Sequence, residues 1–348
     1  MTTLVTGGCG FVGLNVVEQL LAEGEHVVAF DRIGLRGSSR DLARDHGGQL
    51  EVIIGDVRDA REVNAMFDTR RIDAVVHAAA ITAGEQREAS DPHAIVAVNV
   101  NGTLNVLSAA HAAACKRFVY AGSGQAYGDT HDQGAVLREE DSPSRPRELY
   151  GITKLAGEQI VLRLARLWQM SAACVRLGSV CGPWELDTGM RDMLSPHLQV
   201  ARLAVRGETA IVPPREPWRD WIYSRDVAAG LVALLRSPSL RHSVYHLSAG
   251  STWNGAFVRW CEALRSAYPA FQWRIAGAGE RANVSFIIDR DRAPMDNTRM
   301  RSDIGFTPRF DARSAYVDYI QWISCHEDFM SGINDPSHPA SARAEARA

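Results

Sequence analysis

The chain has 348 residues, of which 46% are hydrophobic, so it is long enough to bury a large α/β core with a smaller companion domain. Its formal net charge of −3 gives no electrostatic reason to expect nucleic acid or an anionic membrane as a partner. No apolar run is long enough to cross a bilayer, and the first motif begins too early to follow a signal peptide. The six cysteines are scattered, without metal-ligand spacing, so we expect a cytoplasmic protein with no metal site.

A glycine-rich turn lies close to the start of the chain. A short apolar strand leads into Gly7, Gly10 and Gly13, and an amphipathic helix follows directly. In a dinucleotide-binding turn the first glycine lets the chain turn sharply, the second lets the backbone approach a pyrophosphate, and the third lets the helix pack close to the strand. The helix N-terminus then directs its N–H groups and positive dipole end at the phosphates. The combination predicts a dinucleotide site that includes Phe11 and Val12.

An acidic residue, Asp31, ends the second predicted strand at 27–30. A carboxylate at this position can accept hydrogen bonds from both hydroxyls of the adenosine ribose, and it repels a 2′-phosphate. NAD is therefore favoured over NADP. Arg32 and Arg36 follow closely and are able to receive a phosphate, which leaves NADP as the second possibility.

Strands and helical patterns alternate over the next ninety or so residues. Apolar strands are predicted at 50–57, 74–80 and 117–121, and helices at 60–67 and from Asp91 through Leu107. Such alternation predicts an α/β fold with a doubly wound parallel sheet of the Rossmann type, with helices on both faces. The crossovers should be right-handed, and ligands should bind at the carboxyl ends of the strands.

Two of these strands end in residues that suit a cofactor. Asp56 closes the third strand, where its carboxylate either caps the adenine edge or simply ends the strand. The fourth strand ends in the small residues Ala78, Ala79 and Ala80. A pyrophosphate and a ribose could lie against the backbone there.

Ser123, Tyr150 and Lys154 form a candidate catalytic triad. Ser123 follows a predicted strand, whereas Tyr150 and Lys154 open a helix that continues to Leu167 and lie four residues apart on one face. An ammonium beside a phenol lowers a pKa that is otherwise about 10, which makes the tyrosine a usable base near neutral pH. Ser123 is placed to hydrogen-bond the same substrate oxygen. Tyrosine and lysine also occur at this spacing by chance, but here they follow a dinucleotide-binding pattern.

These motifs resemble those of the extended short-chain dehydrogenases/reductases, in the NAD-dependent epimerase/dehydratase family, which acts largely on nucleotide sugars. The resemblance runs from Thr3 to about Trp322. It is carried by TGGCGFVG at 6–13, Asp31, GDV at 55–57, VVHAAA at 75–80, NVNGT at 99–103, the segment around Ser123, and YGITK at 150–154. It implies cofactor contacts at Asp56 beside adenine, at the adjacent Val57, at Ala78 and Ala79 beside the pyrophosphate, and at Asn99 on the active-site floor. Family members are commonly dimers through two helices, which here correspond to 94–113 and 150–167.

The second half of the chain supplies the candidate substrate contacts. By the resemblance, Ser179 touches the diphosphate region of the substrate, although family members that bind nucleotide sugars usually have asparagine there. Arg219 matches a phosphate-binding arginine of the family, and an ion pair with Asp220 or a neighbouring carboxylate is the alternative role. A second such arginine falls near Arg290 or Arg292, with unusual local spacing.

Two domains and a tail are predicted. Residues 1–175 with about 223–248 should form the NAD-binding Rossmann domain, and about 176–222 with 249–330 should form a smaller, mostly C-terminal α/β domain for the substrate. Later elements are predicted as helices to about 205 and at 227–235, 256–267 and 316–323, with strands at 172–177 and 244–247. The Ser/Pro/Ala-rich segment 331–348 is expected to be disordered.

The chemistry implied by the resemblance is hydride transfer from a substrate carbon to the nicotinamide, with Tyr150 taking the hydroxyl proton. The dehydratases of the family carry an Asp-Glu pair after the serine, and its decarboxylases keep the Glu. Gln125 stands at that position here and cannot act as an acid or a base, so both reactions are disfavoured. We expect an epimerase of a nucleotide sugar, with substrate contacts at Ser123, Gln125, Ser179, Arg219 and Arg292.

A dehydrogenase of a free sugar acid is the alternative reaction. The segment Arg176-Leu177-Gly178-Ser179 resembles the equivalent segment of uronate dehydrogenases. A non-enzymatic Rossmann binding protein is disfavoured, because both Tyr150 and Lys154 are present.

Overall fold

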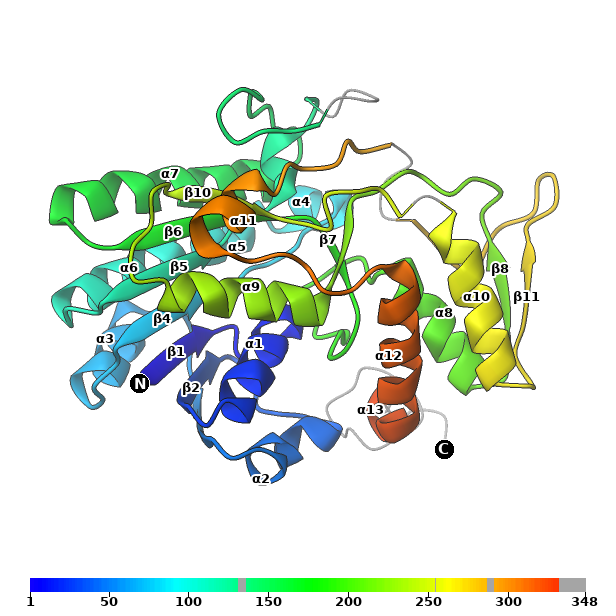
Figure 1. Cartoon of the computed structure of the whole chain (residues 1–348), viewed down its shortest axis with the longest axis horizontal. Helices are drawn as coiled ribbons and strands as arrows, with labels where there is room; N and C mark the ends of the chain where they lie inside the picture. The colour runs from blue at the N-terminus through cyan, green and yellow to red at the C-terminus, as the bar shows by residue number, and fades with distance from the viewer. Residues whose placement is uncertain (131–135, 254, 287–290, 332–348) are drawn as a thin grey trace.

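The structure, a computed structural model, describes residues 1–130, 136–253, 255–286 and 291–331. Figure 1 shows a large sheet with its helices on one side of the molecule and a smaller group of helices and strands on the other. The α/β doubly wound fold predicted from the sequence is confirmed. In the described part of the chain, no helix has the length and apolar character needed to span a membrane.

Seven parallel strands form the large sheet, in the order β10-β6-β5-β4-β1-β2-β3. Their bounds are β1 Thr2–Thr6, β2 His26–Asp31, β3 Gln49–Ile54, β4 Ala74–His77, β5 Arg117–Ala121, β6 Ala172–Leu177 and β10 Val244–Leu247. The strand order reverses between β1 and β4, because the chain first builds through β2 and β3 and then returns to the other side of β1. In open α/β sheets this switch point is where ligands bind.

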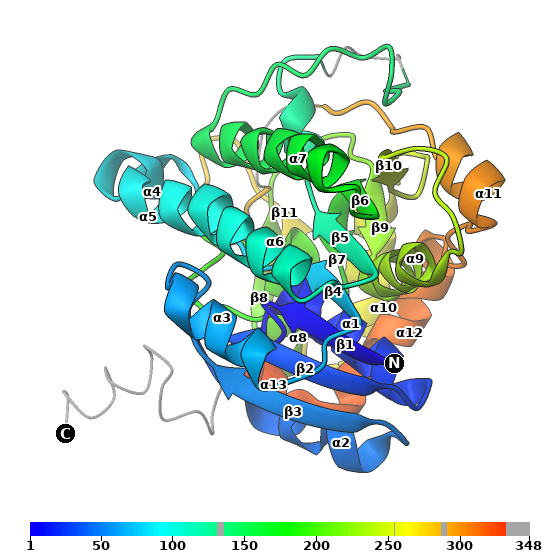
Figure 2. The same cartoon turned by 90° about the vertical axis from the view of Figure 1, so that its left-hand side faces the viewer.

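Alternate residues of the strands feed two hydrophobic layers. Val5 and Val27 join the layer that holds α1 (Phe11–Ala22) and α9 (Ser224–Arg236). Leu4 and Val28 join the layer of α3 (Ala60–Asp68), α6 (Thr103–Ala112) and α7 (Leu149–Trp168). Figure 2 shows α3, α6 and α7 along one face of the sheet and α1 and α9 along the other. Since both faces are covered, the strands are mainly apolar, which is why they are easy to recognise in the sequence.

The helix predicted from Asp91 onward contains a π-helical segment. It runs as α5 (Pro92–Val96), the π-helical η2 (Ala97–Gly102) and then α6. The Asp91 side chain caps its start by accepting the N–H of Ala94 at 3.2 Å. A π segment inside an α-helix shifts the following side chains around the axis and is frequent near functional sites. Here it contains the buried Asn99.

The smaller part consists of α8 (Pro196–Val205), α10 (Ala256–Ala267) and α12 (Ala312–Cys325), together with a two-stranded parallel sheet of β8 (Thr209–Val212) and β11 (Gln272–Ile275). The sequence analysis missed both strands, because each has four residues and β11 is largely exposed. Shorter elements are η1 Gly37–Asp41, α2 Leu42–Asp45, α4 Glu85–Ser90, η3 Gly124–Tyr127, β7 Ser179–Cys181, β9 Trp221–Tyr223, α11 Thr298–Ile304 and α13 Glu327–Ser331. The first residue of the expected disordered tail ends α13, and the remainder, 332–348, lies outside the described residues.

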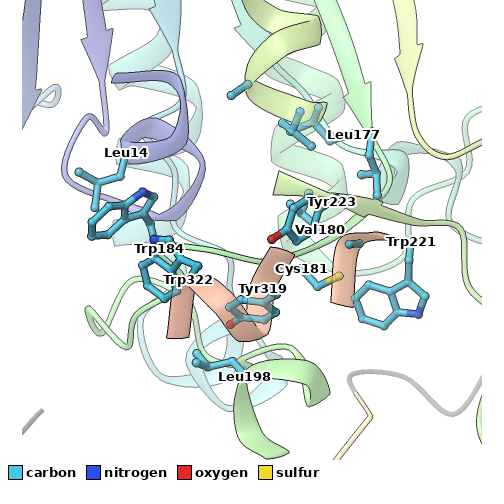
Figure 3. Close-up of a cluster of buried hydrophobic side chains, with 14 of the residues drawn as sticks. Leu14, Leu177, Val180, Cys181, Trp184, Leu198, Trp221, Tyr223, Tyr319 and Trp322 are labelled. Carbon is cyan, nitrogen blue, oxygen red and sulfur yellow. The ribbon is translucent and has the colours of Figure 1, made fainter. Parts of the chain in front are cut away.

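A continuous hydrophobic cluster joins the two parts (Figure 3). Trp184 is a buried member of this cluster. Its ring meets that of Trp322 edge to face at 4.9 Å, and its indole N–H donates to Glu18 on α1 at 2.9 Å. The backbone of Trp184 is left-handed, with φ of 65°, a conformation that a bulky residue adopts only when its surroundings enforce it. The hydrogen bond from Trp184 to Glu18 connects the segment after β7 to α1, the helix that follows the glycine turn.

Candidate active site

One cavity of about 830 Å³ opens at the switch point of the sheet. Its volume is within the usual range of ligand sites, about 300–1,000 Å³. Of the residues predicted from the sequence, it is lined by Gly7, Gly10, Phe11, Val12, Gly13, Asp31, Arg32, Asp56, Val57, Ala78, Ala79, Ala80, Ser123, Gln125, Tyr150, Lys154, Ser179, Arg219 and Arg292. Asn99 is not in its lining. Arg290, the alternative to Arg292, lies outside the described residues.

The glycine turn packs so closely that two of its glycines are needed by the fold itself. Gly7 has a φ of 67°, and a Cβ on it would come within 2.7 Å of the Ala79 backbone nitrogen. A Cβ on Gly13 would lie 2.0 Å from the Gly7 carbonyl oxygen. Gly10 differs, because a Cβ there meets only the Gly7 carbonyl oxygen, at 3.3 Å. Its missing side chain mainly leaves space in the cavity, which fits a pyrophosphate laid against the backbone.

Asp31 is held beside this turn by backbone donors. Its two carboxylate oxygens accept the N–H groups of Cys9 at 3.0 Å and Ile33 at 3.3 Å. Burial raises the pKa of Asp31, and these hydrogen bonds oppose that effect. Arg32 lies with its Nε 3.6 Å from a carboxylate oxygen of Asp56, so these two predicted cofactor residues pair with each other. Arg36 does not line the cavity.

A buried series of hydrogen bonds lies behind the residues predicted to bind the cofactor. The Thr103 hydroxyl donates its proton to the Asn99 carbonyl at 2.8 Å. Toward His77 it must therefore be the acceptor, so Nε2 of His77, 2.9 Å away, carries the proton. Nδ1 of His77 is then the acceptor for the Thr6 hydroxyl, at 2.6 Å. Burial lowers the pKa of His77 to about 3, so this ring is neutral. These hydrogen bonds fix His77 at the end of β4, directly before Ala78.

The buried side chain of Asn99 hydrogen-bonds two segments next to the cavity. Its side-chain amide donates to the Ile81 carbonyl and to the Thr153 hydroxyl, each at 3.0 Å, and its side-chain oxygen accepts the Ile81 N–H at 2.8 Å. Thr153 in turn donates to the carbonyl of Tyr150 at 2.9 Å. The Asn99 side chain thus points toward Ile81 and the start of α7, outside the cavity lining, and it links these two segments. The predicted cofactor contact at Asn99 stays a prediction.

The three triad residues come together in the cavity from two elements. Ser123 follows β5, and its hydroxyl oxygen accepts the Gln125 N–H at 3.1 Å, which leaves its proton for another acceptor. Tyr150 and Lys154 lie in the first turns of α7. The ammonium of Lys154 lies 4.3 Å from the centre of the Tyr120 ring, and burial lowers the pKa of Lys154 to about 7. Sequence reasoning missed the aromatic support under the lysine.

A carboxylate on α4 also reaches the start of α7. Glu88 accepts the backbone N–H of Tyr150 at 3.4 Å and lines the cavity. The N–H groups in the first turn of a helix have no partner within that helix, so Glu88 satisfies one of them and favours the orientation of α7. No sequence pattern pointed to this residue, because it lies 62 positions before its partner.

The residues predicted to contact the substrate line the cavity on or near β7 and β9. These strands pair in parallel with Ser179 opposite Trp221, and both residues line the cavity. Arg219, two residues before the start of β9, is buried. The carboxylate of Asp220 accepts the backbone N–H of Met295 at 2.6 Å. The backbone N–H of Arg292 donates to the Trp218 carbonyl at 2.9 Å. These bonds fix the 291–295 segment alongside 218–220 and bring Arg292 to the same cavity as Arg219.

The irregular segment 185–195, which follows Trp184, forms another part of the cavity wall. Thr188, Met190, Arg191 and Met193 line the cavity, and none of them was predicted. The segment is held where it is because Asp192 pairs with Arg87 on α4 and accepts the Gly84 N–H at 2.9 Å.

Comparison with known proteins agrees with this geometry. A family model described as "NAD dependent epimerase/dehydratase family" matches residues 3–248. The chain is 32% identical over 276 residues to "UDP-glucose 4-epimerase 2" of Oryza sativa subsp. japonica, a match that covers 72% of this chain and 65% of the rice protein. It is 26% identical over 344 residues to "dTDP-glucose 4,6-dehydratase" of Actinoplanes sp., covering 95% of this chain and 100% of that protein. The solved structure "MoeE5 in complex with UDP-glucuronic acid and NAD" is 27% identical, with a TM-score of 0.73, and the match covers 93% of this chain and 99% of that one.

Proposed function

The chain belongs to the NAD-dependent epimerase/dehydratase family, and on that basis we propose that it is an epimerase of a nucleotide sugar. It is an enzyme and its cofactor is NAD, as the sequence predicted. The glycine turn, Asp31 and the small residues after β4 are the groups that would hold the cofactor.

The convergence of Arg219 and Arg292 carries the proposal for the substrate. The two arginines are 73 positions apart in the chain, yet both line the cavity that also contains the glycine turn and Tyr150. Guanidinium groups bind phosphate oxygens in a planar, two-pronged geometry, and a diphosphate offers two such groups in a row. Ser179, at the start of β7, lines the same cavity, where its hydroxyl could donate to the same diphosphate.

The chemistry proposed for the triad follows from its arrangement. NAD, when bound, supplies the group that takes and returns the hydride. Tyr150 takes the proton of the reacting hydroxyl, with the ammonium of Lys154 stabilising the phenolate. Ser123 donates its free hydroxyl proton to the same oxygen as a carbonyl forms there. For epimerisation, the cavity would have to hold the resulting ketone loosely enough for it to rotate and present its other face.

Gln125 supports epimerisation over elimination of water. Its side chain replaces the glutamate that the dehydratases of this family place next to the serine, and an amide cannot transfer a proton as an acid or base. The alternative remains a dehydrogenase of a free sugar acid, which is favoured by Ser179 standing where an asparagine is usual.

Cofactor use separates the two reactions. Purified enzyme is incubated with NAD and either a panel of nucleotide sugars or a panel of free sugar acids, while the absorbance at 340 nm and the product isomers are followed together. An epimerase returns every hydride, so isomers form without steady accumulation of NADH. NADH formed in proportion to product from a sugar acid, with no isomer from any nucleotide sugar, would instead establish the dehydrogenase.

We also propose a homodimer that packs through α5, α6 and α7. Val96, Leu104, Ile152 and Leu167 on these helices are large apolar residues between 38% and 55% exposed. Figure 2 shows α6 and α7 side by side on the surface of the sheet. Leu104→Glu should shift the mass measured by light scattering from dimer to monomer, and an unchanged mass would contradict the assignment. The two-domain division and a cytoplasmic location stay predictions.

A further inference from the structure

Arg176 and Glu158 form a buried ion pair one helical turn beyond Lys154. Arg176, on β6, donates from Nε and Nη2 to the two carboxylate oxygens of Glu158, at 2.9 and 2.7 Å. The two side chains are only 6% and 2% exposed. Glu158 lies four residues after Lys154 on α7, so both side chains project from the same face of the helix. Without Arg176, the carboxylate would face the ammonium of Lys154.

The groups that face Lys154 from the sheet are neutral near pH 7. Tyr120 lies under the ammonium from β5, and Cys174 faces it from β6. Burial raises the pKa of both groups well above their usual values. His77, on β4, is neutral because burial and the nearby Lys154 lower its pKa to about 3. None of these groups is an anion that could hold the ammonium.

On α7 itself, Tyr150 lies one turn before Lys154 and Glu158 one turn after it. A carboxylate whose two oxygens are both bound by a guanidinium is close to neutral as a pair, so it attracts a second cation only weakly. We propose that Arg176 is a positioning residue, which occupies the carboxylate of Glu158 and thereby leaves the ammonium of Lys154 to act on Tyr150. This inference rests on the roles proposed above for Tyr150 and Lys154.

The composition of the chain allows Lys154 to be observed directly. Although the chain has 38 lysine and arginine residues, Lys116 and Lys154 are its two lysines. The Lys116 side chain is 73% exposed, whereas Lys154 is buried. Protein labelled with ¹³C and ¹⁵N in lysine alone therefore gives one exposed reference signal and one signal from the site, and each can be followed by NMR as the pH changes.

The test compares the full-length wild type with Arg176→Met, Glu158→Gln and the double variant, all with NAD bound. In Arg176→Met the unpaired carboxylate favours the charged lysine, so the midpoint of Lys154 should rise by about one pH unit or more. In Glu158→Gln the unpaired guanidinium repels the ammonium, so the midpoint should fall. The double variant removes both charges and should titrate close to the wild type. Lys116 should not move in any of them.

Activity gives a second readout of the same coupling. In Arg176→Met the carboxylate competes for the ammonium, so the phenolate of Tyr150 is stabilised less. The acid limb of the kcat/KM profile should then move to higher pH, and the double variant should restore it. A pair that serves only packing would lower the stability of the variants without producing this shift of the acid limb or its restoration in the double variant.

The proposal is overturned if Lys154 titrates in Arg176→Met as it does in the wild type, or if both single variants shift it in the same direction. Should Arg176→Met fail to fold, the other two variants decide, because neither contains an unpaired carboxylate. The midpoint of Lys154 must then be higher in the double variant than in Glu158→Gln, and equal midpoints refute the proposal. The titration needs no substrate, so it is independent of the reaction type. Failure of the proposed triad appears elsewhere, as normal turnover in Tyr150→Phe.

Discussion

Asp31 accepts the backbone N–H of Cys9 at 3.0 Å, which holds the carboxylate that ends β2 against the glycine turn that follows β1. Ile33 donates to the other carboxylate oxygen at 3.3 Å. Both oxygens are thus oriented by the backbone, and each keeps a lone pair for a ribose hydroxyl. We propose that this arrangement lets the carboxylate select NAD over NADP.

Asp31→Ala should weaken NAD binding by about 10- to 100-fold, the effect of losing hydrogen bonds to a charged acceptor. Binding of NADP should change much less, because the carboxylate that repels its 2′-phosphate is also gone. Titrations of both cofactors by calorimetry measure the two affinities. Asp68→Ala, at the exposed end of α3, is the matched control and should bind NAD normally. A wild type that prefers NADP would refute the selection argument.

Tyr150→Phe should keep the fold and bind NAD normally while losing turnover by about 10²- to 10⁴-fold, the usual contribution of a general base. The phenylalanine keeps the ring on α7 and removes only the hydroxyl that takes the proton. Tyr268→Phe, whose hydroxyl contacts Glu327 far from the cavity, controls for the loss of a phenol elsewhere. Near-normal turnover in Tyr150→Phe would assign the proton transfer to another group.

The parts of the site that depend on local pattern were predictable from the sequence. The glycine turn, Asp31, and the pair Tyr150 and Lys154 each follow from the residues around them, since a buried parallel strand is uniformly apolar and its end is easy to locate. Their convergence on one cavity then follows from the topology, because the carboxyl ends of parallel strands meet at one edge of the sheet.

What escaped prediction depends on long-range contacts. Asn99 belongs to a helical pattern that gives no sign of a π-helical segment, so its turn away from the cavity could not be read from the sequence. Met190 and Arg191 belong to an irregular segment that is placed by the pairing of Asp192 with Arg87, 105 positions away. The ion pair of Arg176 joins two elements through residues that each look unremarkable in their own segments.

Arg292→Met should raise the KM for a nucleotide sugar by about 10-fold or more while leaving NAD binding unchanged. The substitution removes one charged donor to the diphosphate, an interaction of about 1.5–3 kcal/mol. Arg219→Met should act in the same direction. Steady-state kinetics and NAD titration on the same preparations separate the two effects.

Arg206→Met, exposed after α8 and outside the cavity, is the matched control for Arg292→Met. It should leave KM unchanged. If Arg292→Met changed neither KM nor kcat with any nucleotide sugar, the diphosphate assignment would be wrong, whatever the reaction type.

Buried histidines should make the fold sensitive to acid. His197 lies against the rings of Trp221 and Phe257 at 4.7 and 5.5 Å, and burial lowers its pKa to about 3. Burial has the same effect on the pKa of His77 and His246. Above pH of about 6.5 these rings are neutral in both the folded and the unfolded chain. Below that pH these rings take up protons only in the unfolded chain, so their contribution to the free energy of unfolding should fall from about pH 6.5 toward pH 3.

His197→Phe tests the share of one ring in this pH dependence. The phenylalanine fits the aromatic surroundings but leaves the Tyr316 hydroxyl without the partner it has at 3.1 Å, so the variant should lose about 1 kcal/mol at pH 7.5. Below pH 6 its free energy of unfolding should fall less steeply than that of the wild type. The slopes should differ by about 1.4 kcal/mol per pH unit, because one proton fewer is taken up on unfolding. Urea unfolding at several pH values measures both effects. His93→Phe, at an exposed position on α5, should keep the wild-type slope, and an equally steep slope in His197→Phe would show that this ring is not kept neutral by the fold.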